Sequence, residues 1–356
     1  MRATKILIMA LLFLASIGCA SICRKDTLPL LRGTELRSAV LSPDGQTIVV
    51  SVDSKSGCRL YKGRTDGSGF VPITNDGERV CAHDPVFSPD GTKIIFSHIS
   101  EGHGDICEIN IDGTGKRCLT SGKNHDDNPV YSPDGSKVYF LRAKVFTHYS
   151  PIALPGWHDA DIYSMNADGT NVSQITSERN YHMSSLSISP QGEALLIMGS
   201  ALVDPIWIIS LADPTNKKSV RPDLDKYRKR ILWVYEKDVD YKALRNPQFS
   251  PDGRKILFSW PYNDELYVMD RETNIAEPIW KPAGSEKRWP SRMYPRYSPD
   301  GQRIIFSTAK RVEVSICDSD FAWTDAFGMG RVMPELWIVN ADGTGLQSVD
   351  VKSEGR

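Results

Sequence analysis

The chain has 356 residues, and its 43 Lys and Arg residues nearly balance its 44 Asp and Glu residues, giving a formal net charge of −1. This balance argues against a nucleic-acid binder, which normally carries a clustered basic face. The sequence has neither a Gly-x-Ser-x-Gly elbow nor a glycine-rich phosphate loop, so hydrolase and nucleotide chemistry are not indicated.

Residues 1–18 are predicted to be a signal peptide of the lipoprotein type, followed by an N-terminal tail over 19–37. The apolar stretch Ile6–Ile17 follows two basic residues and is too short to span a bilayer. The junction from Ser16 to Cys19 is similar to a bacterial lipobox, although serine stands where leucine is usual. We therefore expect a lipid on Cys19, with ordinary cleavage after Gly18 or Ala20 as the alternative.

This N-terminus predicts export to the periplasmic side of a bacterial membrane, in particular the outer membrane. Contact with the membrane is expected through the lipid anchor only, and the protein is expected to be a monomer.

A Ser-Pro-Asp/Gln-Gly turn recurs along the rest of the chain, and each copy is followed by a short apolar run rich in β-branched and aromatic residues. A second strand pattern that ends in an Asp-Gly-type turn follows, as in Asp161–Gly169, so each unit has four antiparallel strands. Such units, repeated four to eight times, are typical of a β-propeller. We predict an all-β, six-bladed β-propeller of four-stranded antiparallel blades over 38–350, whose innermost strands enter the turns. The turns are Ser42–Gly45, Ser88–Gly91, Ser132–Gly135, Ser189–Gly192, Ser250–Gly253 and Ser298–Gly301.

The repeat P-x-F-S-P-D-G-x-x-I-x-F, followed by D-I-Y-x-M-x-x-D-G-T and L-T, resembles the WD40-like (PD40) propeller repeat of the TolB family. Pro85–Phe96 and Pro129–Phe140 match it best. The resemblance covers roughly Ser38–Val349, without the α/β domain that precedes the propeller in that family. It implies a propeller fold rather than a particular function.

The cysteines suggest disulfides, because an even number remains if Cys19 carries a lipid. Cys107 and Cys118 lie symmetrically about the Asp112-Gly113 turn and should face each other across a hairpin. Cys58 opens the third strand of the first unit and Cys81 follows its fourth strand, so both should lie at the same end of that blade. Cys23 and Cys317 are left over. The alternative is that some of these residues are buried thiols.

The long insertions fall in the connections after the second and fourth strands of each unit, on the face opposite the short turns. Loops on a rigid scaffold are where binding usually occurs. Histidines and carboxylates just before the innermost strands should reach the mouth of the central channel, next to aromatic residues. The predicted binding residues are His83, Asp84, His125, Asp126, His182, Trp157 and His158.

Two functions compete for this face. The first is a non-enzymatic module that binds a protein or peptide, without a cofactor and without nucleic acid. The alternative is a glycan binder, or a metal-dependent enzyme similar to the propeller-shaped oligogalacturonate lyases, that uses the His/Asp-lined channel mouth with a divalent metal. The recurring histidine and glutamine ligands of those lyases are not found here. No nucleophile is indicated, and no catalytic residue is assigned.

Overall fold

The computed structural model describes residues 35–54, 57–148, 155–178, 183–199, 206–224, 244–260, 265–280, 294–312 and 331–351. Within these ranges the chain forms 24 β-strands and no helix, which confirms the predicted all-β class. Accordingly, none of the described segments is a helix that could cross a bilayer.

The strands follow one another in antiparallel groups of four. The first group is β1 (Glu35–Leu41), β2 (Thr47–Ser54), β3 (Gly57–Arg64) and β4 (Val71–Pro72). The second is β5 (Val80–Phe87), β6 (Lys93–Ser100), β7 (His103–Asn110) and β8 (Arg117–Cys118), and the third is β9 (His125–Tyr131), β10 (Lys137–His148), β11 (Pro155–Asn166) and β12 (Ser173–Gln174). Since β1 begins at Glu35, the strands start slightly before the predicted boundary at residue 38.

The remaining strands form three more groups of the same kind. These are β13 (Met183–Ile188), β14 (Ala194–Gly199), β15 (Ile206–Ser210) and β16 (Lys217–Val220); β17 (Arg245–Phe249), β18 (Lys255–Trp260), β19 (Glu265–Asp270) and β20 (Ala276–Trp280); and β21 (Arg296–Tyr297), β22 (Arg303–Val312), β23 (Arg331–Asn340) and β24 (Gln347–Val349). Each of them is a separate four-stranded sheet.

The first three groups differ from the predicted separate blades, because they join into one 12-stranded sheet. Two short parallel pairings make the joins: β3 meets β5 at Cys58 and Cys81, and β7 meets β9 at Gly104 and His125. In both cases the third strand of one group touches the first strand of the next. Cys81 therefore lies in the second group, and a bond between Cys58 and Cys81 links two groups instead of closing one.

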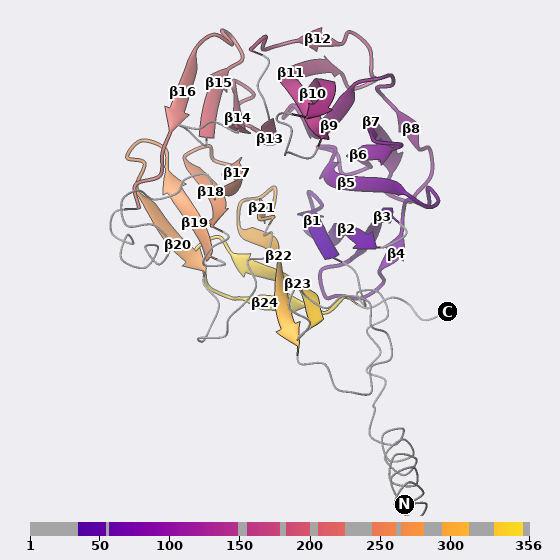
Figure 1. The fold of residues 1–356 in the computed structure, drawn as a ribbon. Helices are drawn as coiled ribbons and strands as arrows, with labels where there is room; N and C mark the ends of the chain where they lie inside the picture. The colour runs from indigo at the N-terminus through magenta and orange to yellow at the C-terminus, as the bar shows by residue number, and fades with distance from the viewer. Residues whose placement is uncertain are drawn as a thin grey trace, which may run out of the picture.

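The groups are arranged around a common centre (Figure 1). The first strand of each group lies nearest the centre, and the fourth strand lies at the outside. The Ser-Pro-Asp/Gln-Gly turns also follow one another in space: a Cβ on Gly91 would lie 3.2 Å from Pro43, and one on Gly135 would lie 3.4 Å from Pro89. The same contact of glycine with the preceding proline recurs at Gly192, Gly253 and Gly301.

The turn is stabilised by its own side chains, as its third copy illustrates. The hydroxyl of Ser132 donates to Asp134 Oδ1 (2.5 Å), and the backbone N–H of Gly135 donates to the Ser132 carbonyl (2.9 Å). Gly135 has φ +71°, a left-handed conformation that suits glycine. The hydrogen bonds from Ser132 and Ser136 lower the pKa of Asp134 to about 2. Because all of these contacts are local, the sequence motif alone predicts the turn.

The core lies between neighbouring groups. One apolar cluster combines Phe96 and Ile94 of the second group with Leu60 of the first, and similar clusters occupy each following junction. A further cluster packs Leu36 of β1 against Leu336 and Ile338 of β23. The two ends of the described chain are thus in apolar contact.

Candidate binding site at the centre of the ring

Four of the innermost strands carry a polar residue in the left-handed conformation, always four positions before the serine of the turn. Asp84, Asn128, Ser185 and Asn246 have φ values of 50°, 53°, 60° and 52°. The strand register shifts at each of these places, as it does at a β-bulge. Bulges re-aim side chains, and Asp and Asn tolerate a positive φ better than most residues.

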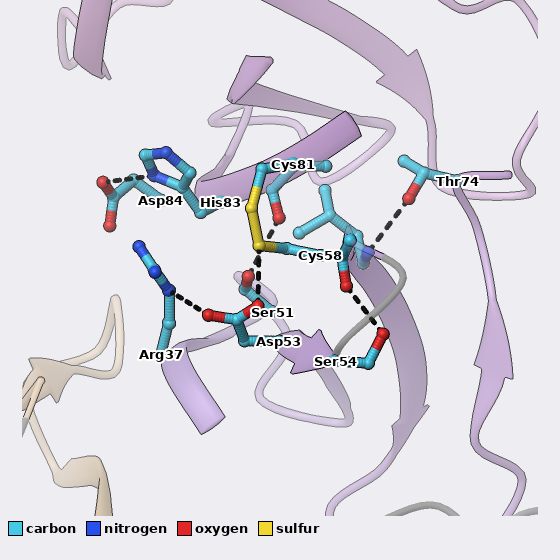
Figure 2. Close-up of a disulfide and its surroundings, with 12 residues drawn as sticks. Arg37, Ser51, Asp53, Ser54, Cys58, Thr74, Cys81, His83 and Asp84 are labelled. Carbon is cyan, nitrogen blue, oxygen red and sulfur yellow. Dashed lines mark hydrogen bonds and ion pairs between the residues drawn. A yellow bond between two sulfur atoms is a disulfide. The ribbon is translucent and has the colours of Figure 1, made fainter. Parts of the chain in front are cut away.

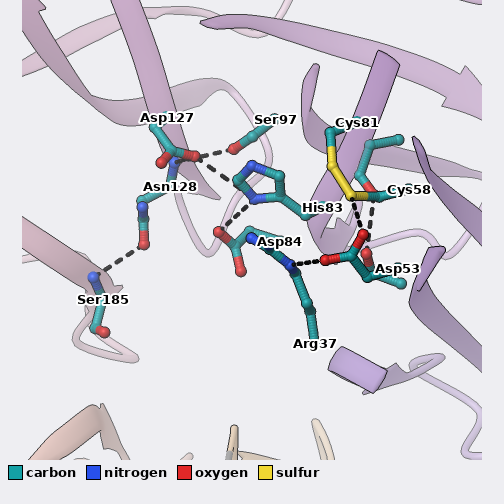
Figure 3. Close-up of polar contacts among 12 residues, drawn as sticks. Arg37, Asp53, Cys58, Cys81, His83, Asp84, Ser97, Asp127, Asn128 and Ser185 are labelled. Atoms are coloured by element: carbon teal, nitrogen blue, oxygen red, sulfur yellow. Dashed lines mark hydrogen bonds and ion pairs between the residues drawn. A yellow bond between two sulfur atoms is a disulfide. The ribbon is translucent and has the colours of Figure 1, made fainter. Parts of the chain in front are cut away.

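These residues connect neighbouring first strands by hydrogen bonds. The amide oxygen of Asn128 accepts from the backbone N–H of Ser185 (2.9 Å), and the hydroxyl of Ser185 donates to Asn246 Oδ1 (2.9 Å). The backbone N–H of Asn128 donates to the hydroxyl of Ser97 in β6 (3.1 Å). Figure 3 shows this polar chain leading towards His83 and Asp84.

His83 is the centre of a charged cluster and is 6% exposed. Its Nδ1 lies 2.9 Å from Asp84 Oδ2 and 3.9 Å from Asp127 Oδ1. Burial lowers the pKa of His83, but the negative charges of Asp127 and Asp84 outweigh this effect and raise the pKa to about 9. For Asp84, burial raises the pKa, yet the pairing with His83 lowers it overall. At neutral pH the cluster therefore contains an imidazolium between two carboxylates.

Two arginines balance the remaining charge. Arg37 of β1 donates from Nε to Asp53 Oδ2 (2.9 Å), and Figures 2 and 3 show its side chain extending below Asp84. Burial lowers the pKa of Arg296 in β21, and the negative charge of Asp84 opposes this effect. Three cations thus face the carboxylates of Asp53, Asp84 and Asp127.

This charge balance bears on metal binding. The donor atoms of His83, Asp84 and Asp127 lie within 4.8 Å of one another, close enough for one cation. A divalent ion would, however, displace the His83–Asp84 hydrogen bond and lie near the two guanidinium groups. The donor set therefore fits an ion-pair network better than a metal centre, and we derive no metal chemistry from it.

An aromatic cluster adjoins the charged one. The ring of Trp157 stacks on His125 with centroids 5.3 Å apart, and it contacts Phe146 at 5.3 Å and His103 at 5.5 Å. Its indole N–H donates to the carbonyl of Gly102 (2.9 Å). His125 Nε2 lies 3.9 Å from Asp127 Oδ2, so the aromatic cluster is continuous with the charged cluster.

The paired strands β10 and β11 form a hairpin whose apolar side chains reach solvent. In β10, Val145 and Phe146 are 40% and 57% exposed, and they are paired with His158 and Trp157 of β11. The pairing of β10 with β9 ends at Ala143 and His125. The hairpin thus extends past β9 and presents apolar groups next to the charged cluster.

The predicted site residues separate into two sets. His83, Asp84, His125 and Trp157 come together as described. Asp126 does not join them, because Arg142 donates to both of its carboxylate oxygens at 2.7 Å. His158 is buried and its Nε2 lies 2.9 Å from the Thr147 carbonyl.

Other predictions fall outside the described residues. These are His182, the lipidation site Cys19, and the two cysteines Cys23 and Cys317.

Asp127 belongs to the carboxylates that the sequence places with the histidines at the channel mouth. Three further residues of the cluster, namely Arg37, Arg296 and Asn128, are missing from the sequence-based set. An alignment of the repeats could have revealed the polar residues of the innermost strands, because they occupy the same position in several units. Asp84, Asn128 and Asn246 each directly precede the first proline of their unit, a position that favours extended or turn backbone over helix. The arginines carry no such signal, because their neighbours come from distant parts of the chain.

Both cysteine pairs form disulfides in the structure. Cys107 pairs with Cys118 between β7 and β8, and Cys58 with Cys81 between β3 and β5. Asp53 connects the second bond to the charged cluster, since its Oδ1 lies 3.2 Å from Cys58 Sγ and its Oδ2 binds Arg37 (Figure 2).

Comparison with known proteins gives the fold. No family model and no curated protein matches the sequence. The structure is similar to the crystal structure of TolB from Acinetobacter baumannii, with a TM-score of 0.56 and 18% identity over 90% of this chain and 64% of that chain. It is also similar to an oligogalacturonate lyase in complex with manganese, with a TM-score of 0.53 and 11% identity over 88% of this chain and 77% of that one.

Both of these proteins are β-propellers, and this likeness supports the predicted TolB-like propeller architecture. The chain spans less than two thirds of the TolB chain that it matches. At such low identity the likeness concerns the fold alone.

Proposed function

We propose that the protein is an exported, lipid-anchored, six-bladed β-propeller that binds a protein or peptide partner on the face opposite the Ser-Pro-Asp/Gln-Gly turns. The observation that carries the proposal is the exposed aromatic hairpin of β10 and β11, which is continuous with the charged cluster at the centre of the ring.

The closed ring rests on contacts between the first and last groups. The apolar cluster of Leu36, Leu336 and Ile338 joins β1 to β23. On the rim of the turns, Arg303 Nη2 donates to the carbonyl of Gly45 (3.0 Å). These contacts continue the pattern seen at the other junctions, which supports six equivalent blades.

Peptide binding suits the chemistry of the proposed site. Trp157 and Phe146 offer amphipathic and apolar contact area of the kind that anchors protein partners. The neighbouring His83, Asp84 and Asp127 provide fixed charges that can orient backbone and side-chain groups of a ligand. Because the partner's contacts would come from rigid strands as well as loops, little ordering would be required on binding.

Site-specific photocrosslinking in cells tests this proposal. A photoreactive phenylalanine analogue replaces Phe146, and the matched control carries it at Val172, an exposed apolar position after the turn that joins β11 to β12. We expect a discrete crosslinked product from position 146. Trp157→Ala should remove that product and weaken binding of the crosslinked partner by about 2 kcal/mol or more.

Crosslinks that form only at position 172 would place the interaction on the opposite face. A crosslink at position 146 that persists unchanged with Trp157→Ala would show that the aromatic cluster does not carry the binding. The alternative is a glycan binder, or a metal-dependent polysaccharide lyase-like enzyme, at the same channel mouth. The balanced charges around His83 do not favour the metal that such an enzyme would need.

A further inference from the structure

A second polar cluster lies away from the ring centre, between the first and second groups. Asp76, in the connection from β4 to β5, faces His98 of β6, with Oδ2 and Nε2 3.8 Å apart. Both atoms are buried, and neither has a hydrogen-bond partner among the described residues. The other oxygen of Asp76 binds Lys116 Nζ. Buried polar atoms without partners are uncommon and need an explanation.

The Cys107–Cys118 disulfide lies next to this pair. Cys107 is paired with Phe96 of β6 on one side and with Cys118 of β8 on the other. His98 lies two residues after Phe96 in β6 and therefore shares the same face of the sheet. One ring nitrogen of His98 and the two Sγ atoms lie within 4.8 Å of one another. Cys107 is fully buried, whereas Cys118 is exposed, which leaves the bond open to attack by a small thiol.

Opening this disulfide would create a set of metal ligands. Two molecules of a low-molecular-weight thiol reduce the bond to two cysteine thiols and are themselves oxidised to one disulfide. Each cysteine then releases a proton on binding a metal as thiolate. Thiolate sulfur, imidazole nitrogen and carboxylate oxygen are the ligands of tetrahedral Zn²⁺ sites.

We propose that Cys107, Cys118 and His98 form a thiol-dependent Zn²⁺ site, and that Asp76, whose Oδ2 lies 3.8 Å from His98 Nε2, positions the imidazole. The site binds zinc when the disulfide is reduced. Thiol–disulfide exchange with a low-molecular-weight disulfide, which is itself reduced to two thiols, re-forms the Cys107–Cys118 bond and releases the metal. This inference is independent of the proposed binding function.

The second disulfide provides an internal control. Asp53, Cys58 and Cys81 are equally close to one another, but they include no histidine. We therefore expect zinc at Cys107 and Cys118 but not at Cys58 and Cys81.

The test compares metal binding by the purified full chain before and after reduction with a phosphine, which is then removed without air. Zinc is titrated by calorimetry, and Co²⁺ serves as a spectroscopic substitute that shows a thiolate-to-metal charge-transfer band. We expect one zinc per chain after reduction and none before it. The double variant Cys107→Ser/Cys118→Ser should abolish binding, whereas Cys58→Ser/Cys81→Ser should retain it.

His98→Ala is the decisive variant, because it keeps every cysteine. The affinity of His98→Ala for zinc should fall at least tenfold, even if reduction loosens the sheet. Asp76→Asn should also weaken zinc binding. Equal zinc binding by His98→Ala and the parent chain would show unspecific capture by thiols and overturn the proposal. Loss of zinc in the Cys58→Ser/Cys81→Ser variant would overturn it as well.

Discussion

His83 is a buried cation whose charge depends on residues from two neighbouring strands. Asp84 follows it in β5, and Asp127 comes from β9. Because the pKa of His83 is raised above the ordinary value of 6.5, its pairing stabilises the folded state in full below about pH 6.5. That contribution is lost as the pH rises through about 9.

This pH dependence is measurable. A pKa raised from 6.5 to about 9 corresponds to about 3 kcal/mol at most. We expect the free energy of unfolding of the parent chain, relative to His83→Gln, to decrease by up to this amount between pH 6.5 and 9.5. Denaturant titrations at several pH values check it, with His103→Gln on the surface as the control. An unchanged difference across this range would mean that His83 is neutral in the folded protein.

At the scale of elements, the junction between β1 and the last group decides whether the ring is closed. Leu336 of β23 is 1% exposed and packs in the cluster shared with β1, whereas Leu346 is 45% exposed. Leu336→Ala should lower the free energy of unfolding by about 3 kcal/mol, as is usual for a leucine removed from a packed core.

The same substitution at Leu346 is the matched control and should cost less than about 0.5 kcal/mol, as surface changes do. Chemical denaturation followed by tryptophan fluorescence measures both variants. If the two variants unfold alike, the first and last groups do not pack against each other in solution.

At the scale of the whole molecule, the predicted lipid anchor on Cys19 would hold the propeller at a membrane. Intact-mass spectrometry of the membrane fraction should show a mature N-terminus at Cys19 that carries acyl chains, because Gly18-Cys19 follows a short apolar segment. Cys19→Ser should abolish the acylation while the strands, which begin at Glu35, still fold. A mature N-terminus at Ser21 would instead indicate ordinary cleavage.

The strands and turns were predictable from the sequence because their determinants are local. Each Ser-Pro-Asp-Gly segment contains the donors, the acceptors and the glycine that its turn requires, as Ser132, Asp134 and Gly135 demonstrate. The facing of Cys107 and Cys118 across a short hairpin likewise depends on only a few residues of chain.

Only the tertiary structure decided which side chains meet at the centre. Asp127 approaches His83, and Arg296 approaches Asp84, across strands that are far apart in sequence and are brought together by the arrangement of the groups. Asp126 and Asp127 are adjacent in the chain, yet β-strand alternation sends one to Arg142 and the other to the cluster. The sequence therefore determines the repeated unit, whereas the site depends on the packing of units around the ring, because the groups that meet there come from different units.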